Sequence, residues 1–443
     1  MEKYHEYKDS GIEWLGNIPE HWNNYRVDWV TSIVRGNTGL KKDELLNNGN
    51  YVALQYGKTY KVDEVNNSFS FYVNSELYKK SQVVHYGDII LISTSETIED
   101  LGHSCFYNRE DLGLLGGEQI LLKPDSKQVV EKYLYYYSKF FCLELRKYAT
   151  GLKVFRFNND DLKNIFILIP PLKEQTQIAN YLDIKTTTID KKITLLQQKI
   201  KHYKAYRKTL INETVTKGLD KTAKLKDSGV DWIGDIPEHW EIRRYKSFGK
   251  TIKGKNMETS DVEFENSLPL LSLEYLRNDS VQHPTFCYSN DKSLKSTDDD
   301  LIIVWDGAAV GEIIKSKIGY VSSTIAKLDI NNKKFNTKYF YHLRGAIDYK
   351  LKQIPTGMGI PHLNPTLFKN FKCPEPPIKE QQQIANYLDT KTTTIDKIVN
   401  NIETQITMLK ELRKTLINEV VTGKVKVTST SLSHQKASNQ PIV

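Results

Sequence analysis

The sequence predicts an α+β fold with a pseudo-twofold internal repeat, in which two mixed α/β globules alternate with two long helices that pack as an antiparallel coiled coil. Two duplicated stretches are the basis of this prediction. The segment PPLKEQTQIANYLDIKTTTIDK (170–191) returns as residues 376–397 with 19 of 22 positions identical. The segment KDSGIEWLGNIPEHW (8–22) returns as residues 226–240 with 11 of 15 positions identical. Both pairs occur in the same order, so we expect two halves built to one plan.

Each copy of the longer repeat begins a predicted helix, over residues 170–217 and 376–424. A proline pair suits the first turn of a helix, and Gly218 and Gly423 are suitable stops. Between these ends apolar side chains recur every seven residues, in one row per helix: Leu182, Ile189, Leu196, Tyr203 and Leu210, then Leu388, Ile395, Ile402, Leu409 and Leu416. This spacing is typical of a coiled coil. Each helix could instead pack on its own globule, but two seams of equal length favour mutual packing.

The other segments divide the chain further. An N-terminal arm and the first globule occupy residues 1–169, and the second globule occupies residues 230–375. Both globules contain short β-rich runs followed by a Tyr-rich segment of helical character, which predicts a mixed α/β fold. Residues 218–229 are charged and poor in apolar side chains, as expected of a linker, and residues 425–443 are expected to form a disordered tail.

Composition limits the class of protein. The 443 residues carry 62 Lys and Arg against 54 Asp and Glu, a net charge of +8 that permits a polyanionic partner without requiring one. No apolar run approaches the roughly 20 residues that cross a bilayer, and the N-terminus lacks the apolar core of a signal peptide. We therefore expect a cytoplasmic protein with no membrane contact. The four scattered cysteines predict free thiols and no metal site.

The sequence predicts no catalytic residues and no metal ligands. Asp183 and Asp389 stand in D-x-K patterns of the kind found in metal-dependent nucleases. Both lie inside the predicted helices, however, without a paired acid on a nearby strand. We therefore interpret them as solvated helix positions.

Binding residues can be proposed where cations and aromatic rings gather in the variable globules. Lys and Arg neutralise phosphates, and a few polar side chains can contact base edges in the major groove. The candidates are Arg35, Lys41, Lys42, Tyr56, Lys58 and Lys61 in the first globule and Lys250, Lys253, Lys255 and Arg277 in the second. For any single one of these residues, an ordinary basic surface is an equally good interpretation.

The helix starts are candidate partner-binding sites because they recur while residues 192–206 and 398–412 have diverged. A helix that needed only an apolar seam could have diverged at its start too. The candidate residues are Glu174, Gln175 and Ile178 with their counterparts Glu380, Gln381 and Ile384. The alternative is that they pack each helix start against its neighbouring globule.

The doubled plan resembles the specificity subunit of type I restriction–modification systems. The resemblance rests on two variable globules that alternate with near-identical helices, on the PPLKEQ and PPIKEQ helix starts, and on the twin W-(L/I)-G-x-I-P-E-H-W arms. It covers residues 1 to about 424. It implies that each globule is a target recognition domain for one half of a bipartite site in double-stranded DNA. It also implies that the helices set the gap between the half-sites.

The resemblance further implies a non-catalytic subunit without a cofactor of its own. Its expected partners are two methyltransferase (modification) subunits that methylate adenine and a restriction subunit that is an ATP-dependent translocase and nuclease. These partners would use S-adenosylmethionine, ATP and magnesium. Two alternatives remain open, namely a coiled-coil scaffold with two protein-binding globules and no DNA contact, and a nuclease that uses the helix aspartates. The DNA sequence and the gap length do not follow from these residues.

Overall fold

The computed structural model describes residues 2–278, 284–352 and 359–428. The chain divides into two compact units, of which the first contains residues 1–196 and 404–443 and the second contains residues 197–403. Most of the predicted tail, residues 429–443, lies outside the described residues. Residues 425–428 are described, and the Lys426 backbone N–H donates to the carbonyl of Glu2. The first unit therefore contains both ends of the described chain.

Two long helices, α5 (Leu172–Lys217) and α9 (Ile378–Val421), are the largest elements. Each begins directly after its proline pair and ends directly before or close to a glycine. Gly218 and Gly423 have positive φ angles of 76° and 72°, the conformation that favours glycine after a helix. The helices thus begin and end within three residues of the predicted positions.

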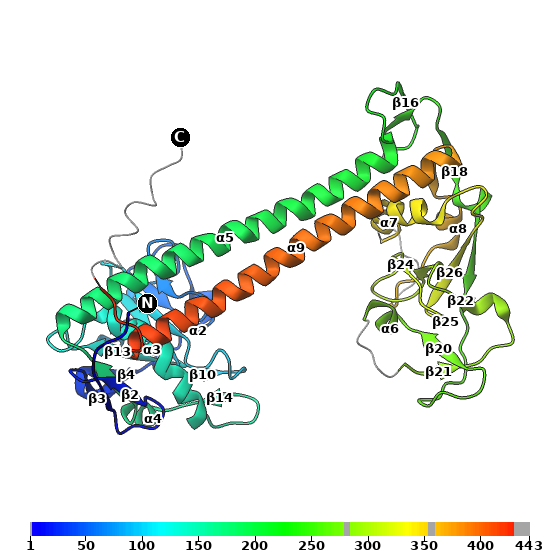
Figure 1. Ribbon diagram of the computed structural model, residues 1–443. Helices are drawn as coiled ribbons and strands as arrows, with labels where there is room; N and C mark the ends of the chain where they lie inside the picture. Colours follow the sequence, from blue (N-terminus) through cyan, green and yellow to red (C-terminus); the bar gives the residue numbers. More distant parts are fainter. Residues whose placement is uncertain (1, 279–283, 353–358, 429–443) are drawn as a thin grey trace. The chain divides into compact units, whose positions relative to one another are not determined.

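Each unit contains a stretch of α5 that lies antiparallel to a stretch of α9 (Figure 1). In the second unit Lys204 pairs with Glu403 at 3.6 Å and Arg207 pairs with Asp396 at 3.0 Å, so residue numbers rise along one helix and fall along the other. In the first unit the equivalent Arg413 pairs with Asp190 at 3.1 Å. The knobs-into-holes packing of a coiled coil stays a prediction.

The predicted apolar rows lie on the inner side of these helix pairs. Leu182, Ile189 and Leu416 are buried in the first unit, as are Leu388, Ile395 and Ile402 in the second. The remaining members of the rows are partly buried (Leu196, Tyr203, Leu210 and Leu409). Burial is what the seven-residue spacing predicts.

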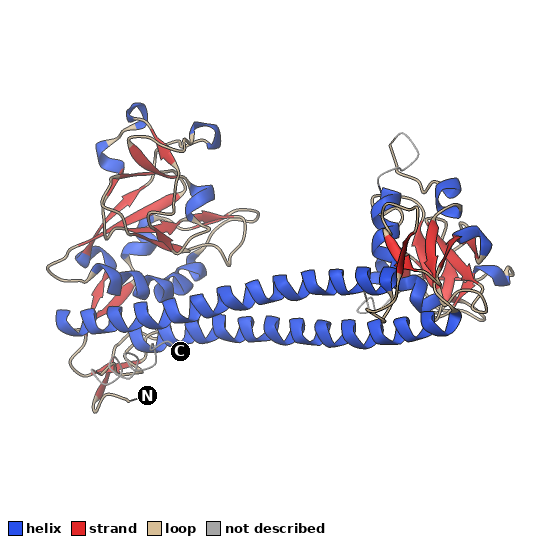
Figure 2. Cartoon of the chain, turned by 90° about the horizontal axis from the view of Figure 1, so that it is seen from above, coloured by secondary structure: helices blue, strands red, loops and turns tan. Residues whose placement is uncertain are grey.

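The first globule contains two main sheets (Figure 2). The larger has the order β4 (Thr31–Arg35), β13 (Gln119–Pro124), β9 (Ile89–Ile92), β11 (Ser104–Tyr107), β6 (Glu64–Val65). The smaller has the order β7 (Tyr72–Val73), β5 (Tyr51–Leu54), β12 (Gly113–Leu115), β8 (Val83–Val84). Two strand pairs complete it: β3 (Asn23–Arg26) with β15 (Phe166–Ile169), and β10 (Thr94–Ser95) with β14 (Phe155–Arg156). Its helices are α1 (Val27–Val30), α2 (Tyr56–Thr59), α3 (Glu131–Leu145) and α4 (Asn159–Lys163).

The second globule repeats the strand order of the smaller sheet and of four of the five strands of the larger sheet, with different residues. Its larger sheet has the order β19 (Gly249–Lys253), β26 (Ile325–Ile330), β23 (Leu301–Val304), β24 (Ile313–Lys315). Its smaller sheet has the order β21 (Phe286–Cys287), β20 (Leu268–Leu271), β25 (Gly319–Val321), β22 (Lys295–Ser296). The strand pair is β18 (Glu241–Arg244) with β27 (Lys372–Glu375), and the helices are α6 (Leu273–Arg277), α7 (Thr337–Lys352) and α8 (Pro365–Lys369). The predicted pseudo-repeat is thus present in the strand order as well as in the helices.

Each arm is a hairpin that closes the end of a long helix. The hairpins are β1 (Tyr7–Asp9) with β2 (Asn17–Pro19), and β16 (Leu225–Asp227) with β17 (Asp235–Pro237). Fully buried Trp22 follows the first hairpin and lies against Gly423, while Trp240 follows the second and lies against Gly218. Since β16 lies within residues 218–229, that segment is not only a linker but also supplies one strand of the second arm.

Candidate nucleic-acid interface

Four of the six predicted residues of the first globule line one cavity of about 470 Å³. Lys42 comes from a short helical turn before β5, Tyr56 and Lys58 come from the short helix α2 after β5, and Lys61 follows α2. Arg35 and Lys41 are exposed near this region but do not line the cavity. The fold therefore brings together, beside the smaller sheet, cations that are spread over twenty residues of the sequence.

Aromatic rings lie close to two of these cations, Lys58 and Lys61. Tyr56 and Tyr60 stack with ring centroids 5.6 Å apart, and Lys61 lies 5.4 Å from the Tyr60 ring. The Lys58 ammonium lies 4.4 Å from the centre of the Phe71 ring. Cations over ring faces are attracted by the ring quadrupole while they remain able to meet an anion.

The loop after β9 supplies the opposite wall of the cavity, which the sequence analysis missed. Ser95, Glu96, Thr97 and Asp100 line it, and the Thr97 hydroxyl donates to Asp100 at 2.8 Å. Partial burial raises the pKa of Tyr56, whose hydroxyl bonds with Ser95. The polar run directly after the buried strand was a signal that could have indicated this loop. The cavity thus combines cations, which are suited to phosphates, with acceptors, which are suited to base amino groups.

The four predicted cations of the second globule do not form one cluster. Lys253 pairs with Asp306 at 3.2 Å, Lys255 pairs with Asp291 at 3.0 Å, and Arg277 pairs with Glu312. Lys250 is exposed on β19. Because three of the four cations already face a carboxylate, this surface is less basic than their number suggests.

Arg35 of the first globule and Lys253 of the second nevertheless occupy equivalent positions in the fold. This equivalence could not be predicted from the two duplicated segments, because neither residue lies within them. Each is the last residue of the edge strand of the larger sheet and is followed by a glycine at a close backbone contact. A Cβ on Gly36 would lie 2.0 Å from the Gly116 carbonyl oxygen, and one on Gly254 would lie 2.1 Å from that of Ser322. These glycines allow the strand to approach the smaller sheet and direct both loops that follow.

The helix-start residues are placed differently from the prediction. Gln175, Ile178, Gln381 and Ile384 are fully buried, so their side chains cannot meet a partner directly. Gln175 accepts from the Val130 backbone N–H at 2.8 Å and donates to the carbonyls of Gln128 and Pro170. Gln381 accepts from the N–H of Asn336 at 2.7 Å and donates to the carbonyl of Pro376. They join each helix start to the helix α3 or α7 of its globule, as the alternative interpretation of packing against the neighbouring globule describes.

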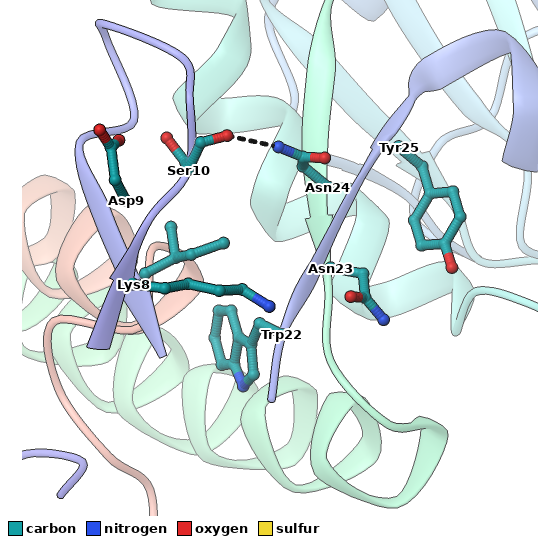
Figure 3. A pocket seen from close by; sticks show the side chains of 8 residues that line it. Lys8, Asp9, Ser10, Trp22, Asn23, Asn24 and Tyr25 are labelled. Atoms are coloured by element: carbon teal, nitrogen blue, oxygen red, sulfur yellow. Dashed lines mark hydrogen bonds between the residues drawn. The ribbon is translucent and has the colours of Figure 1, made fainter. Parts of the chain in front are cut away.

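Glu174 and Glu380 bind the arms. The His21 ring lies 2.9 Å from Glu174, and the His239 ring lies 2.9 Å from Glu380. Glu380 also accepts from Trp240 Nε1 at 3.1 Å, whereas Trp22 Nε1 is buried without a hydrogen-bond partner among the described residues. Figure 3 shows Trp22 beside Lys8 and Asn23 in a small polar pocket where Asn24 donates to the Ser10 carbonyl.

Exposed apolar side chains recur elsewhere on the long helices. Leu172 and Ile378 occupy the same repeat position and are 43% and 41% exposed. Tyr206 and Leu412 also share a repeat position and are 55% and 51% exposed. These pairs are surface positions that could contact a partner in both halves, which the buried glutamines cannot.

The helix aspartates have internal partners. Tyr136 donates to Asp183 at 2.6 Å, and the buried His342 lies 2.9 Å from Asp389. Within the described ranges no group of three or more His, Cys, Asp or Glu could hold a metal ion. No described helix is both long enough and apolar enough to cross a membrane. All four cysteines are free and buried, and burial raises the pKa of Cys105 to about 12.

The fold and these surfaces define a class: a duplicated α/β protein in which each of two globules is attached to an antiparallel pair of long-helix segments. Residues 19–202 and 237–408 match the type I restriction modification DNA specificity domain. The chain therefore belongs to the family of type I restriction–modification specificity subunits.

Known relatives agree with this assignment. The type I restriction enzyme MjaVIII specificity subunit of Methanocaldococcus jannaschii is 35% identical over 43% of this chain and 44% of its own length. The putative type I restriction enzyme MjaX specificity subunit of the same organism is 25% identical over 93% of this chain and 96% of its own.

Two solved structures share the fold. A chain from a study of complex assembly and conformational transition of the type I R-M system matches 92% of this chain and 99% of its own, with a TM-score of 0.72 and 17% identity. The HsdS subunit from Thermoanaerobacter tengcongensis matches 92% and 98%, with a TM-score of 0.55 and 17% identity.

Proposed function

We propose that each globule recognises one half of a bipartite site in double-stranded DNA and that the helices set the gap between the halves. The observation that carries this proposal is the repetition of one topology with different residues in its loops. Two readers on one scaffold can recognise two different half-sites, and linking them raises affinity through effective concentration. The rival function, a scaffold with two protein-binding globules, gives no reason for cations at the loop ends of both sheets.

In the first globule the cavity at α2 is the proposed contact with DNA. Lys42, Lys58 and Lys61 would approach phosphates or guanine, and the carboxylates of Glu96 and Asp100 would accept from base amino groups. In the second globule Lys253 lies 5.4 Å from the Trp305 ring and pairs with Asp306. Bound DNA would either displace Asp306 from Lys253 or accept a bond from Lys253 while Asp306 stays in place. In the second case Asp306 would favour a base whose amino group donates a hydrogen bond to it.

Docking of two methyltransferase subunits is proposed at the recurring exposed positions of the helices. In the first unit these are Leu172 and Leu412, and in the second they are Ile378 and Tyr206. A partner present twice requires the same kind of contact twice, and exposed apolar side chains supply it. We propose that S-adenosylmethionine, ATP and magnesium are used by the methyltransferase and restriction subunits. This chain would contribute recognition and assembly.

The test neutralises two cavity lysines. The double variant Lys58→Gln/Lys61→Gln should weaken DNA binding by the assembled complex and lower the slope of log K against log salt by about 1.8, since each phosphate contact contributes about 0.9. Binding titrations at several salt concentrations measure the slope. Mapping of methylated adenines then shows which half-site is affected.

The matched control is Lys127→Gln/Lys153→Gln, which removes two exposed lysines of the same globule outside the cavity. Its salt slope should stay at the wild-type value. A slope equally reduced in both variants would mean that the cavity has no special place in DNA binding. Salt-independent binding of the wild-type complex would favour the scaffold function.

A further inference from the structure

The second unit contains a cavity of about 660 Å³ between the end of α5, helix α7 and the second arm. Its apolar lining comes from all three elements: Ile211, Val215, Trp232, Leu343, Ala346 and Tyr349. Tyr349 is 65% exposed at the edge of the cavity. None of the DNA-binding candidates lines it, so it is a separate feature of this unit.

In the first unit an aromatic ring occupies the equivalent place. Helices α3 and α7 align through the 206-residue repeat, which pairs Phe140 with Ala346 and Lys139 with Gly345. Phe140 packs against Trp14 of the first arm with ring centroids 5.4 Å apart. In the second unit Trp232 packs instead on Phe371, and a Cβ on Gly345 would meet no atom within 4 Å. The cavity is therefore the space that Phe140 fills in the other half.

The cavity is also strongly basic. Lys204, Arg207, Lys208, Arg344 and Lys350 line it, against one carboxylate, Asp231. Lys204 and Arg207 pair with acids of α9, but no ion pair is described for Lys208, Arg344 or Lys350 in the parts of the chain that the structure describes. An occupant should therefore carry negative charge beside its apolar group.

A buried polar atom gives a second indication of an occupant. His342 lines the cavity and is only 4% exposed. Its Nε2 lies 2.9 Å from Asp389, while Nδ1 has no hydrogen-bond partner among the described residues. Buried polar atoms are nearly always bonded in native proteins, so an unbonded one beside a cavity is consistent with a missing donor or acceptor.

We infer that this cavity binds an aromatic side chain flanked by carboxylates on a partner protein. Where that partner is a methyltransferase subunit, the inference rests on the proposed function. A protein side chain is the occupant because a phenyl ring carried on a helix already fills the same place in the first unit. Among the described residues the first half does not offer the same site, because Phe140 fills the equivalent place beside Trp14.

The experiment uses the full chain and the probe peptide acetyl-Glu-Phe-Glu-amide. Saturation-transfer NMR should detect the phenyl protons of the bound peptide at one site per chain. The variant Ala346→Phe restores the residue type of the first half and should weaken binding about tenfold or more, because the ring of the probe loses its buried surface. It should keep its fold, which circular dichroism and thermal unfolding check. Arg344→Gln should weaken binding less and make it less dependent on salt.

Two control peptides and one nucleotide define the specificity. Acetyl-Glu-Ala-Glu-amide and acetyl-Lys-Phe-Lys-amide should each bind at least about tenfold more weakly than the probe. Equal binding of either control, no binding of the probe, or binding unchanged by Ala346→Phe would overturn the inference. ATP that bound in place of the probe would also overturn it. None of these results touches DNA recognition, which methylation mapping tests separately.

Discussion

The first and second halves share a backbone plan, but different side chains make the equivalent contacts. At one repeat position of the Tyr-rich helix, Tyr136 donates to Asp183 in the first half, whereas His342 meets Asp389 in the second. Behind the second arm, Trp240 donates to Glu380. Behind the first arm, Tyr4 donates to Glu174, and Trp22 Nε1 has no hydrogen-bond partner in the parts of the chain that the structure describes. The comparison shows that the helix aspartates and glutamates are retained as acceptors, while the donors that meet them vary.

Both halves contain the buried glutamine at the helix start. Replacing it should lower the free energy of unfolding more than any other change considered below. Gln175→Leu and Gln381→Leu leave a backbone N–H and a carbonyl unpaired in the interior. Each should lower the free energy of unfolding by about 3 kcal/mol. Gln175→Leu should cost more, because Gln175 bonds three backbone groups and Gln381 bonds two. Urea unfolding measures both values.

Thr176→Gln is the control for these variants, since the second half carries Gln382 at that position. Thr176 is exposed, so its replacement should change the free energy of unfolding by less than about 0.5 kcal/mol. If Gln175→Leu unfolded at the wild-type urea concentration, the internal role of the repeated glutamines would be refuted.

The two buried tryptophans should respond unequally to the same change. Trp240→Phe removes a hydrogen bond to a carboxylate, whereas Trp22→Phe removes an N–H that no described residue accepts from. We expect Trp240→Phe to be the more destabilising by about 1–2 kcal/mol, since the loss of ring volume is common to both. Thermal unfolding of the two variants gives the difference. Equal losses would mean that the bond to Glu380 adds nothing to stability.

The two halves should also differ, by a smaller amount, in how their stability depends on pH, because His342 stands where the first half has Tyr136. Burial lowers the pKa of His342 despite the opposing effect of Asp389. A folded-state pKa below the unfolded value means that protonation favours the unfolded chain, so stability should fall as pH drops below about 6.5. Burial also raises the pKa of Asp348, to about 6, which acts in the opposite direction between about pH 6 and 4.

The variant His342→Tyr isolates the histidine, because it places the residue of the first half at this position and leaves Asp348 unchanged. Between pH 7.5 and 5.5 the free energy of unfolding of the wild-type chain should fall more than that of the variant, because the lowered pKa of His342 favours protonation of the unfolded chain. The same loss in both proteins would assign the pH dependence to other groups.

The long helices could be predicted because their signals are local. The proline pairs, the seven-residue apolar rows and the glycine stops all lie within the segments that they define. The sheets could be predicted only as β-rich runs, since the pairing of β4 with β13 joins residues about ninety positions apart and no local pattern specifies it. The alternation of apolar residues indicates a strand but not its neighbour.

The candidate site was predicted in part for the same reason. Lys42, Tyr56, Lys58 and Lys61 are close in sequence, so their clustering followed from the pattern. Glu96 and Asp100 reach the cavity only through the sheet order. Repetition of Gln175 and Gln381 indicates a constraint on both helix starts, but repetition does not separate a partner contact from a buried backbone contact. Only the burial of the side chains does that.

The division of the chain into units also bears on its synthesis. The second unit is one continuous stretch, whereas the first needs residues 404 onward to complete its helix pair. Domains commonly fold in the order in which the ribosome produces them. Here the first unit is translated first, but it cannot complete its helix pair until residues 404 onward are made. In that last segment Arg413 pairs with Asp63 and Asp190. The second half should therefore reach its native state earlier during translation, and a nascent chain that stopped short of residue 404 would expose the unpaired face of α5.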